Sequence, residues 1–191
     1  MKKLVIIAAL VVATSSAFAQ SVVFANTAGV AYKLTTNNVA GTALGNMSGA
    51  NAYRIGLYAA GGAGQTENSL VLVGLATNAA TAALAGNFNG GNPFFLPSPF
   101  LAGDTITFQV RSWQFSGGLT YAEAFLAGVA TGRSSVGSTV LGGGTVPAGA
   151  LFGTSAGQIG SFSAVAPIPE PSSIAIGLLG LGAVALFRRR K

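Results

Sequence analysis

The central part of the chain consists of short runs of β-forming residues separated by clusters of glycine. In the clearest run, 105–113, Ile106, Phe108 and Val110 alternate with polar residues, which is the pattern of a strand with one face in water. Further strands are predicted at 21–25, 30–34, 53–59, 69–76 and 159–165. Glycine-rich turns lie between the runs at 60–64, 86–92, 116–118 and 142–144. This organisation predicts an all-β domain, either a β-sandwich or a jelly-roll-like fold.

Four connecting segments have a less regular pattern. The proline-containing segment 92–99 predicts a stiff extended loop, and 116–118 predicts a hairpin turn. The alanine-rich segment 78–85 and the segment 121–129 predict short helices, with a strand or an irregular turn as the alternative for each.

The net charge of +6 comes mainly from the two ends of the chain. Between residues 20 and 168 the charge is only +1, because four cations face three carboxylates: Lys33, Arg54, Arg111, Arg133, Glu67, Asp104 and Glu123. A nucleic-acid-binding domain needs a basic patch on the folded body, so no nucleic-acid partner is expected. The low charge and apolar composition also argue against disorder.

Chemistry that depends on cysteine or histidine is excluded, because the chain contains neither residue. Disulfides, a catalytic triad with histidine, and the usual zinc or copper ligand sets are therefore absent. The segment 153–157 fits the letters of a nucleophile elbow, but it has no histidine partner. The three carboxylates are scattered along the body, so no calcium-binding loop is expected. We expect no metal and no cofactor.

Acid–base catalysis by two carboxylates is the remaining enzymatic alternative. A hairpin around Gly117 would bring the strands of Asp104 and Glu123 together, as a glycosidase requires. Surface solubility is the more ordinary role for both side chains. The protein is therefore predicted not to be an enzyme.

A sugar-binding surface is predicted as an alternative function. Trp113 lies in phase with Arg111 on the polar side of its strand, and Tyr58 shares a face with Arg54, so Trp113, Arg111 and Tyr58 form a candidate ligand face. Asn87, Asn89 and Asn92 also cluster beside three phenylalanines, Phe88, Phe94 and Phe95. A strand bulge would instead turn Trp113 into the core, as is usual for a lone tryptophan in a small β domain.

The N-terminal residues 1–19 have the features of a signal peptide. Lys2 and Lys3 precede the apolar run 4–13, and Ala17 and Ala19 frame a cleavage site that predicts a mature chain beginning at Gln20. Export by the Sec machinery follows from this reading, and an anchor that is never cut is the alternative.

The C-terminal residues 169–191 form a three-part tail. Pro169, Glu170 and Pro171 are followed by the uncharged run 172–187 and then by four cations, Arg188, Arg189, Arg190 and Lys191. The run spans about 24 Å as a helix, against about 30 Å of bilayer hydrocarbon, and the cations favour the cytoplasmic side. The tail is predicted to anchor the protein in the membrane by one helix, after a β-rich domain at 20–163 and a linker at 164–168.

The order of these three parts resembles the PEP-CTERM sorting signal of Gram-negative bacteria. The resemblance covers roughly an eighth of the chain and implies recognition and cutting by exosortase, an integral-membrane enzyme. It also links the chain to exopolysaccharide and the biofilm matrix. It implies nothing about the fold of the body.

These features together predict a protein with its body in the periplasm, held in the inner membrane until processing. The body then becomes a structural or adhesive component of the cell surface or extracellular matrix. Two alternatives remain open: a carbohydrate-binding module that acts on exopolysaccharide, and a membrane protein that stays anchored permanently.

Overall fold

The computed structural model describes residues 20–27, 32–38 and 40–165. The predicted signal peptide at 1–19 and the sorting tail at 169–191 lie outside these residues. Within the described residues, none of the helices has the length and apolar character of a membrane span.

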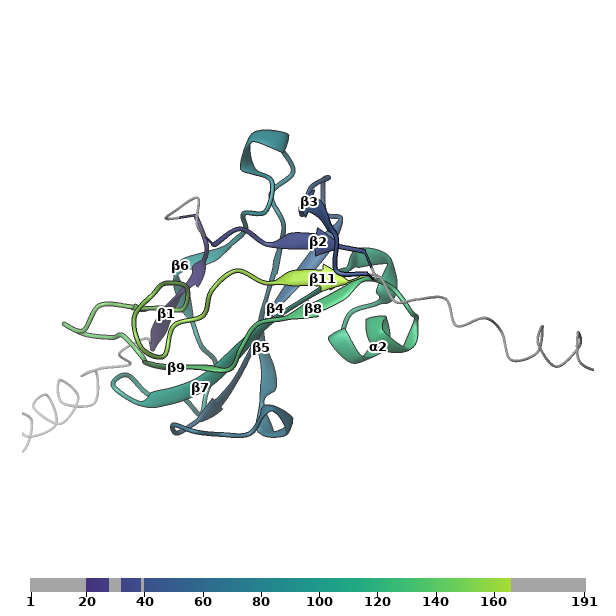
Figure 1. Cartoon of the computed structure of the whole chain (residues 1–191). Helices are drawn as coiled ribbons and strands as arrows, with labels where there is room; N and C mark the ends of the chain where they lie inside the picture. Colours follow the sequence, from purple (N-terminus) through teal and green to yellow (C-terminus); the bar gives the residue numbers. More distant parts are fainter. Residues whose placement is uncertain (1–19, 28–31, 39, 166–191) are drawn as a thin grey trace, which may run out of the picture.

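The body is built from short strands with little helix (Figure 1). The strands are β1 (Ser21–Ala25), β2 (Thr35–Asn37), β3 (Ala43–Asn46), β4 (Tyr53–Gly61), β5 (Val71–Thr77), β6 (Asn89–Phe95), β7 (Thr105–Gln114), β8 (Thr131–Arg133), β9 (Gly137–Val140), β10 (Gly149–Ala150) and β11 (Ser163–Val165). Among the described residues, the connections include the short 3₁₀ helices η2 (Glu67–Ser69), η3 (Ala82–Leu84) and η4 (Phe115–Gly117) and the α-helix α2 (Tyr121–Leu126). The predicted all-β class is confirmed.

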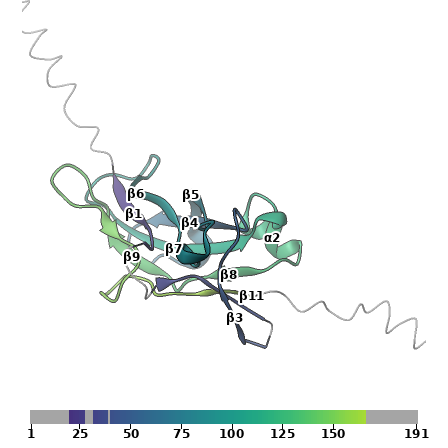
Figure 2. The same ribbon diagram turned by 90° about the horizontal axis from the view of Figure 1, so that it is seen from above.

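The strands form two sheets of unequal size (Figures 1 and 2). The small sheet has the order β10-β1-β6, and the eight-stranded sheet has the order β3-β2-β11-β8-β7-β4-β5, with β9 paired to β7. The pairs β1–β10 and β11–β2 are parallel, and the other pairs are antiparallel. The long strands β4 and β7 pair without a register shift, so they form the rigid centre of the large sheet.

The main hydrophobic core joins the two sheets. The inward residues of β7 are Ile106, Phe108 and Val110, as their alternation predicts, and all three are fully buried. Phe24 of β1 belongs to the same core and meets Phe88 edge-on, with ring centroids 5.1 Å apart. Burial of these large side chains replaces the disulfides that the chain lacks.

The predicted strands at 53–59, 69–76, 105–113 and 21–25 are confirmed with small shifts in their ends. Two others are wrong in part. The described residues of 30–34 contain no strand, because Leu34 exchanges hydrogen bonds with the loops around Met47 and Gly86. Only β11 forms within 159–165, since the Ile159 N–H bonds to the Leu151 carbonyl instead.

The connecting segments differ from prediction in more places. The segment 78–85 holds only η3, because the side chain of Asn78 bonds to the backbone of Tyr53 and Gly49 rather than capping a helix. The predicted loop at 92–99 begins as strand β6. Proline is tolerated there because β6 is an edge strand, where a missing N–H costs no ladder bond.

The predicted hairpin turn at 116–118 is wrong. The glycines instead lead through η4 into α2, so the chain leaves the sheet before it returns as β8. The helical reading of 121–129 is confirmed for its first six residues. A capping box starts this helix: the Thr120 hydroxyl accepts the Glu123 N–H, and the Glu123 carboxylate accepts the Thr120 N–H.

Candidate functional site

The face of β7 opposite the main core carries two of the residues predicted to bind a ligand. Thr107, Gln109, Arg111 and Trp113 alternate along it. The η2 loop and α2 pack against this face, and Thr107 and Gln109 are buried. The prediction that this face lies in water is therefore wrong. A period of two shows that a strand has two kinds of face, but it does not show what covers the polar one.

Trp113 is the centre of a second hydrophobic cluster beneath α2. Its side chain is 0 % exposed, and its indole N–H donates to the Gly118 carbonyl at 3.2 Å. The cluster also contains Tyr58, Leu70 and Ala124. The prediction of an exposed indole is wrong, and the alternative of a core tryptophan is confirmed. No bulge causes this burial, because β4 and β7 stay in register throughout.

Gly56 of β4 makes room for the indole. A Cβ atom at this position would lie 2.9 Å from Cζ3 of Trp113 and 3.0 Å from Cδ1 of Leu72. The missing side chain therefore leaves room for the indole against β4, which explains a glycine in the middle of a strand.

Arg111 lies between two tyrosine rings. Its guanidinium carbon is 4.2 Å from the ring centroid of Tyr58 and 5.4 Å from that of Tyr121. Its Nε donates to Oε1 of Gln109 at 2.7 Å. Burial raises the pKa of Tyr58, although the nearby Arg111 charge opposes this, so the phenol stays neutral at ordinary pH. Arg111 and Tyr58, which were predicted to face a ligand, thus pack against each other.

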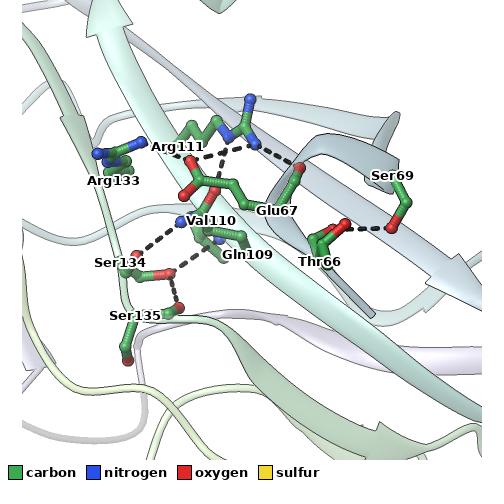
Figure 3. Close-up of polar contacts among 9 residues, drawn as sticks. All are labelled: Thr66, Glu67, Ser69, Gln109, Val110, Arg111, Arg133, Ser134 and Ser135. Atoms are coloured by element: carbon green, nitrogen blue, oxygen red, sulfur yellow. Dashed lines mark hydrogen bonds and ion pairs between the residues drawn. The ribbon is translucent and has the colours of Figure 1, made fainter. Parts of the chain in front are cut away.

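Glu67 of η2 joins two arginines of the large sheet (Figure 3). Its Oε1 lies 2.6 Å from Nη1 of Arg133 and 3.6 Å from Nη2 of Arg111. The Arg133 side chain is 59 % exposed, so that pair is worth only about 0–1 kcal/mol. The cluster closes η2 over the sheet. Sequence reasoning missed it, because Glu67 and Arg133 are far apart in the chain and no local pattern links them.

Hydrogen bonds continue this cluster into the next turn (Figure 3). Nε2 of Gln109 donates to the Ser134 carbonyl at 2.9 Å, and the Val110 N–H donates to Oγ of Ser134 at 3.1 Å. The Ser134 hydroxyl donates to the Ser135 carbonyl at 2.6 Å. The polar groups thus bond to one another, so the arrangement is chemically suited to holding the η2 loop and the turn after β8 in place.

The two carboxylates considered for acid–base chemistry lie at opposite ends of β7. Asp104 precedes the strand and accepts the Leu101 N–H at 3.0 Å, whereas Glu123 caps α2 beyond the other end. A ten-residue strand is about 30 Å long, far more than the roughly 10 Å that a glycosidase pair spans. The hairpin that would have joined them does not form.

Glu123 provides a test of stability against pH. The backbone N–H groups of Thr120 and Leu119 bond to its carboxylate and lower its pKa from the ordinary value of 4.5. A lowered folded-state pKa stabilises the fold above the unfolded-state value, and this contribution is lost as the pH falls through the folded-state pKa. We therefore expect Glu123→Gln to flatten the fall in melting temperature below about pH 4.5. An unchanged acid profile in a series of thermal melts would contradict this role.

The remaining candidate segments have ordinary structural positions. Residues 153–157 form a turn, in which the Ser155 N–H bonds to Oε1 of Gln158, rather than a strand-to-helix elbow. Among the described residues, no group of three or more metal-ligating side chains comes together. Asn87 and Asn89 line an open hollow of about 410 Å³, but Phe88 beside them is buried in the main core.

The predicted mature N-terminus lies on the small sheet. Nε2 of Gln20 donates to the Leu96 carbonyl at 2.6 Å, next to the pairing of β1 with β6. Ala17, Ala19 and the sorting residues Pro169, Glu170 and Pro171 lie outside the described residues, as do Arg188, Arg189, Arg190 and Lys191.

Comparison with known families identifies the tail. Residues 167–191 match the family model described as the PEP-CTERM protein-sorting motif, which confirms the resemblance. The motif indicates an exported protein that is sorted by an exosortase, with a membrane-associated stage before surface release. This chain carries that motif at its C-terminus. No curated protein and no solved structure matches the chain.

Proposed function

We propose that the protein is a non-catalytic component of the cell surface or extracellular matrix, of structural or adhesive type. Its body is held outside the inner membrane by the run 172–187 until an exosortase processes the tail. The observation that carries this proposal is the complete motif at 167–191, in the order of recognition residues, apolar run and cations.

The chemistry of the body supports a non-catalytic role. Each carboxylate of the described body has a structural partner: Glu67 binds two arginines, Asp104 holds a turn and Glu123 caps a helix. A catalytic acid or base needs a free face toward a substrate. The three carboxylates of the body are instead used in holding loops and a helix.

The carbohydrate-binding alternative loses the side chain on which it rested. Trp113 is buried under α2, so it offers no flat ring to a sugar. We therefore do not propose exopolysaccharide binding as a second function. A body that takes part in the matrix through its strand edges and surface loops fits the described structure better.

Substitution of the motif tests the proposal. Changing Pro169, Glu170 and Pro171 together to alanine is expected to keep the protein in the membrane fraction with Lys191 still attached, because the processing enzyme loses its recognition residues. The measurement is the fraction of protein outside the cell, by immunoblot of separated fractions. The matched control changes Thr145, Val146 and Pro147, an exposed triplet of the body, to alanine and should leave delivery intact. Equal delivery of both triple variants would contradict the proposal.

A further inference from the structure

The end of the described chain and α2 lie at the same end of the large sheet. Pairing places Arg54 opposite Trp113, Trp113 opposite Thr131 and Thr131 opposite Val165, so these residues form one row across four strands. The chain runs from β7 through η4 and α2 to β8 just beyond this row. β11, which ends at Val165, therefore ends beside the α2 connection (Figures 1 and 2).

The α2 connection presents an apolar surface at this end. Four of its large apolar side chains are exposed to solvent, from 43 % to 87 %: Phe115, Leu119, Phe125 and Leu126. We call these four residues the α2 surface. The helix is held to the body by its other side, where Ala124 is fully buried and Tyr121 meets Trp113. Phe125 and Leu126 are therefore exposed in a helix that is already docked. Phe115 lies at the edge of the α2 surface, where the Arg54 guanidinium stacks on its ring at 3.9 Å.

The α2 connection carries almost no charge. Between residues 115 and 130 Glu123 is the sole ionisable acid or base apart from the Tyr121 phenol, and its carboxylate is engaged with the backbone at the helix start. Contact between the α2 surface and the interfacial layer would thus bring the exposed Glu123 carboxylate, and the Arg54 guanidinium that stacks on Phe115, to the headgroups, where charges stay hydrated.

The length of chain beyond Val165 limits how far this surface can be from a membrane. Six residues, 166–171, separate Val165 from the uncharged run that begins at Ser172. Even fully extended, they span only about 20 Å. The Gln20 end of the body lies at the opposite end of the sheet from α2. Ser21 bonds to Gly142, which lies just past β9, and the last residue of β9 pairs with the first residue of β7. A run inserted in the bilayer therefore holds the α2 end, and not the Gln20 end, close to the lipid.

We propose that the α2 surface rests in the interfacial layer of the bilayer while the tail is inserted. This inference rests on the proposed anchoring by 172–187. The short tether keeps the apolar side chains at a high effective concentration near the lipid, so a small surface is enough for contact. Removal of the tail ends this advantage, and a surface of four side chains is then too small to hold the body on the membrane. The contact thus orients the body before processing and permits its release afterwards.

A depth measurement with a fluorescent label tests this contact. The chain contains no cysteine, so Leu126→Cys and Leu101→Cys each provide a single attachment site in the mature protein that begins at Gln20 and keeps its tail. Leu126 is 87 % exposed on α2, whereas Leu101 is 65 % exposed at the opposite end, beside Asp104. Each labelled protein is reconstituted in vesicles of phosphatidylethanolamine and phosphatidylglycerol, with or without a lipid that carries a quencher in its acyl chain.

We expect the quenching lipid to reduce the signal of the label at position 126 several-fold more than that at position 101. Adding Leu119→Ser and Phe125→Ser to the Leu126→Cys protein should lower its quenching toward the level at position 101, with Trp113 emission reporting an intact fold.

Three results would overturn the inference. Equal quenching at both positions would show that the body has no preferred side. A label at 126 that is shielded from a water-soluble quencher but not reached by the quenching lipid would show that protein, such as a second copy, covers α2. Failure of the protein to float with the vesicles would refute anchoring by the tail itself, and this outcome is separate from the other two.

Discussion

Trp113→Ala is expected to lower the free energy of unfolding by about 3–5 kcal/mol. The indole is fully buried, and it joins β7, β4 and α2 in one cluster. Its removal leaves a cavity between the sheet and the helix that rigid strands cannot close, because β4 and β7 pair along nine residues. The loss should appear as a lower urea midpoint in far-UV circular dichroism.

Phe125→Ala is the matched control for this substitution. It also removes an aromatic ring from the same region, but this ring is 67 % exposed and contributes no core packing. We expect its unfolding free energy to stay within about 0.5 kcal/mol of the parent value. If the two variants were destabilised equally, Trp113 would not be the core residue described above.

Asn26→Ala is expected to cost about 2–4 kcal/mol, because it leaves buried backbone groups without their partner. Asn26 is 2 % exposed, and its side chain bonds to three backbone groups. Its Nδ2 donates to the carbonyls of Tyr32 and Gly86, and its Oδ1 accepts the Phe88 N–H at 2.7 Å. These bonds join the end of β1 to Tyr32, six residues further along the chain, and to the loop at Gly86 and Phe88, which is distant in sequence.

Asn38→Ala is the matched control for Asn26→Ala. Its Oδ1 accepts a single N–H, from Thr42, within an exposed turn, and water can replace this bond. We expect a change of about 0.5 kcal/mol or less in the same denaturation experiment. A cost for Asn26→Ala no larger than this would show that the three bonds do not hold the loops.

The strands that were predicted best are those whose residues alternate over a long run. β4 and β7 place alternate side chains in the main core, and the core lies where Ile106, Phe108 and Val110 predict it. Segments that were wrongly predicted as strands, such as 30–34, are held instead by hydrogen bonds to distant loops. Such bonds leave no local pattern, because the partner of Leu34 lies around Gly86.

The polar face of β7 shows why the candidate site could not be predicted. The alternation of Gln109, Arg111 and Trp113 predicts an exposed face, but the η2 loop and α2 cover it. One signal was available in the sequence: Thr120 and Glu123 have the spacing of a capping box and mark the helix that buries Trp113. The partnership of Glu67 with Arg111 and Arg133 had no such signal.

The division between the tail and the body follows from these results. The tail carries a motif that indicates sorting, whereas the described body uses its few charges to hold loops and caps. A low free charge and a body stabilised by burial suit a protein that persists outside the cell without disulfides.

The mass of the intact native protein, measured separately in membrane and extracellular fractions, tests the central claim most directly. We predict that the extracellular protein begins at Gln20 and ends near Pro169–Pro171, and that the membrane fraction contains chains that still carry Lys191. A protein found only in the membrane, with Lys191 present in every molecule, would contradict processing by an exosortase.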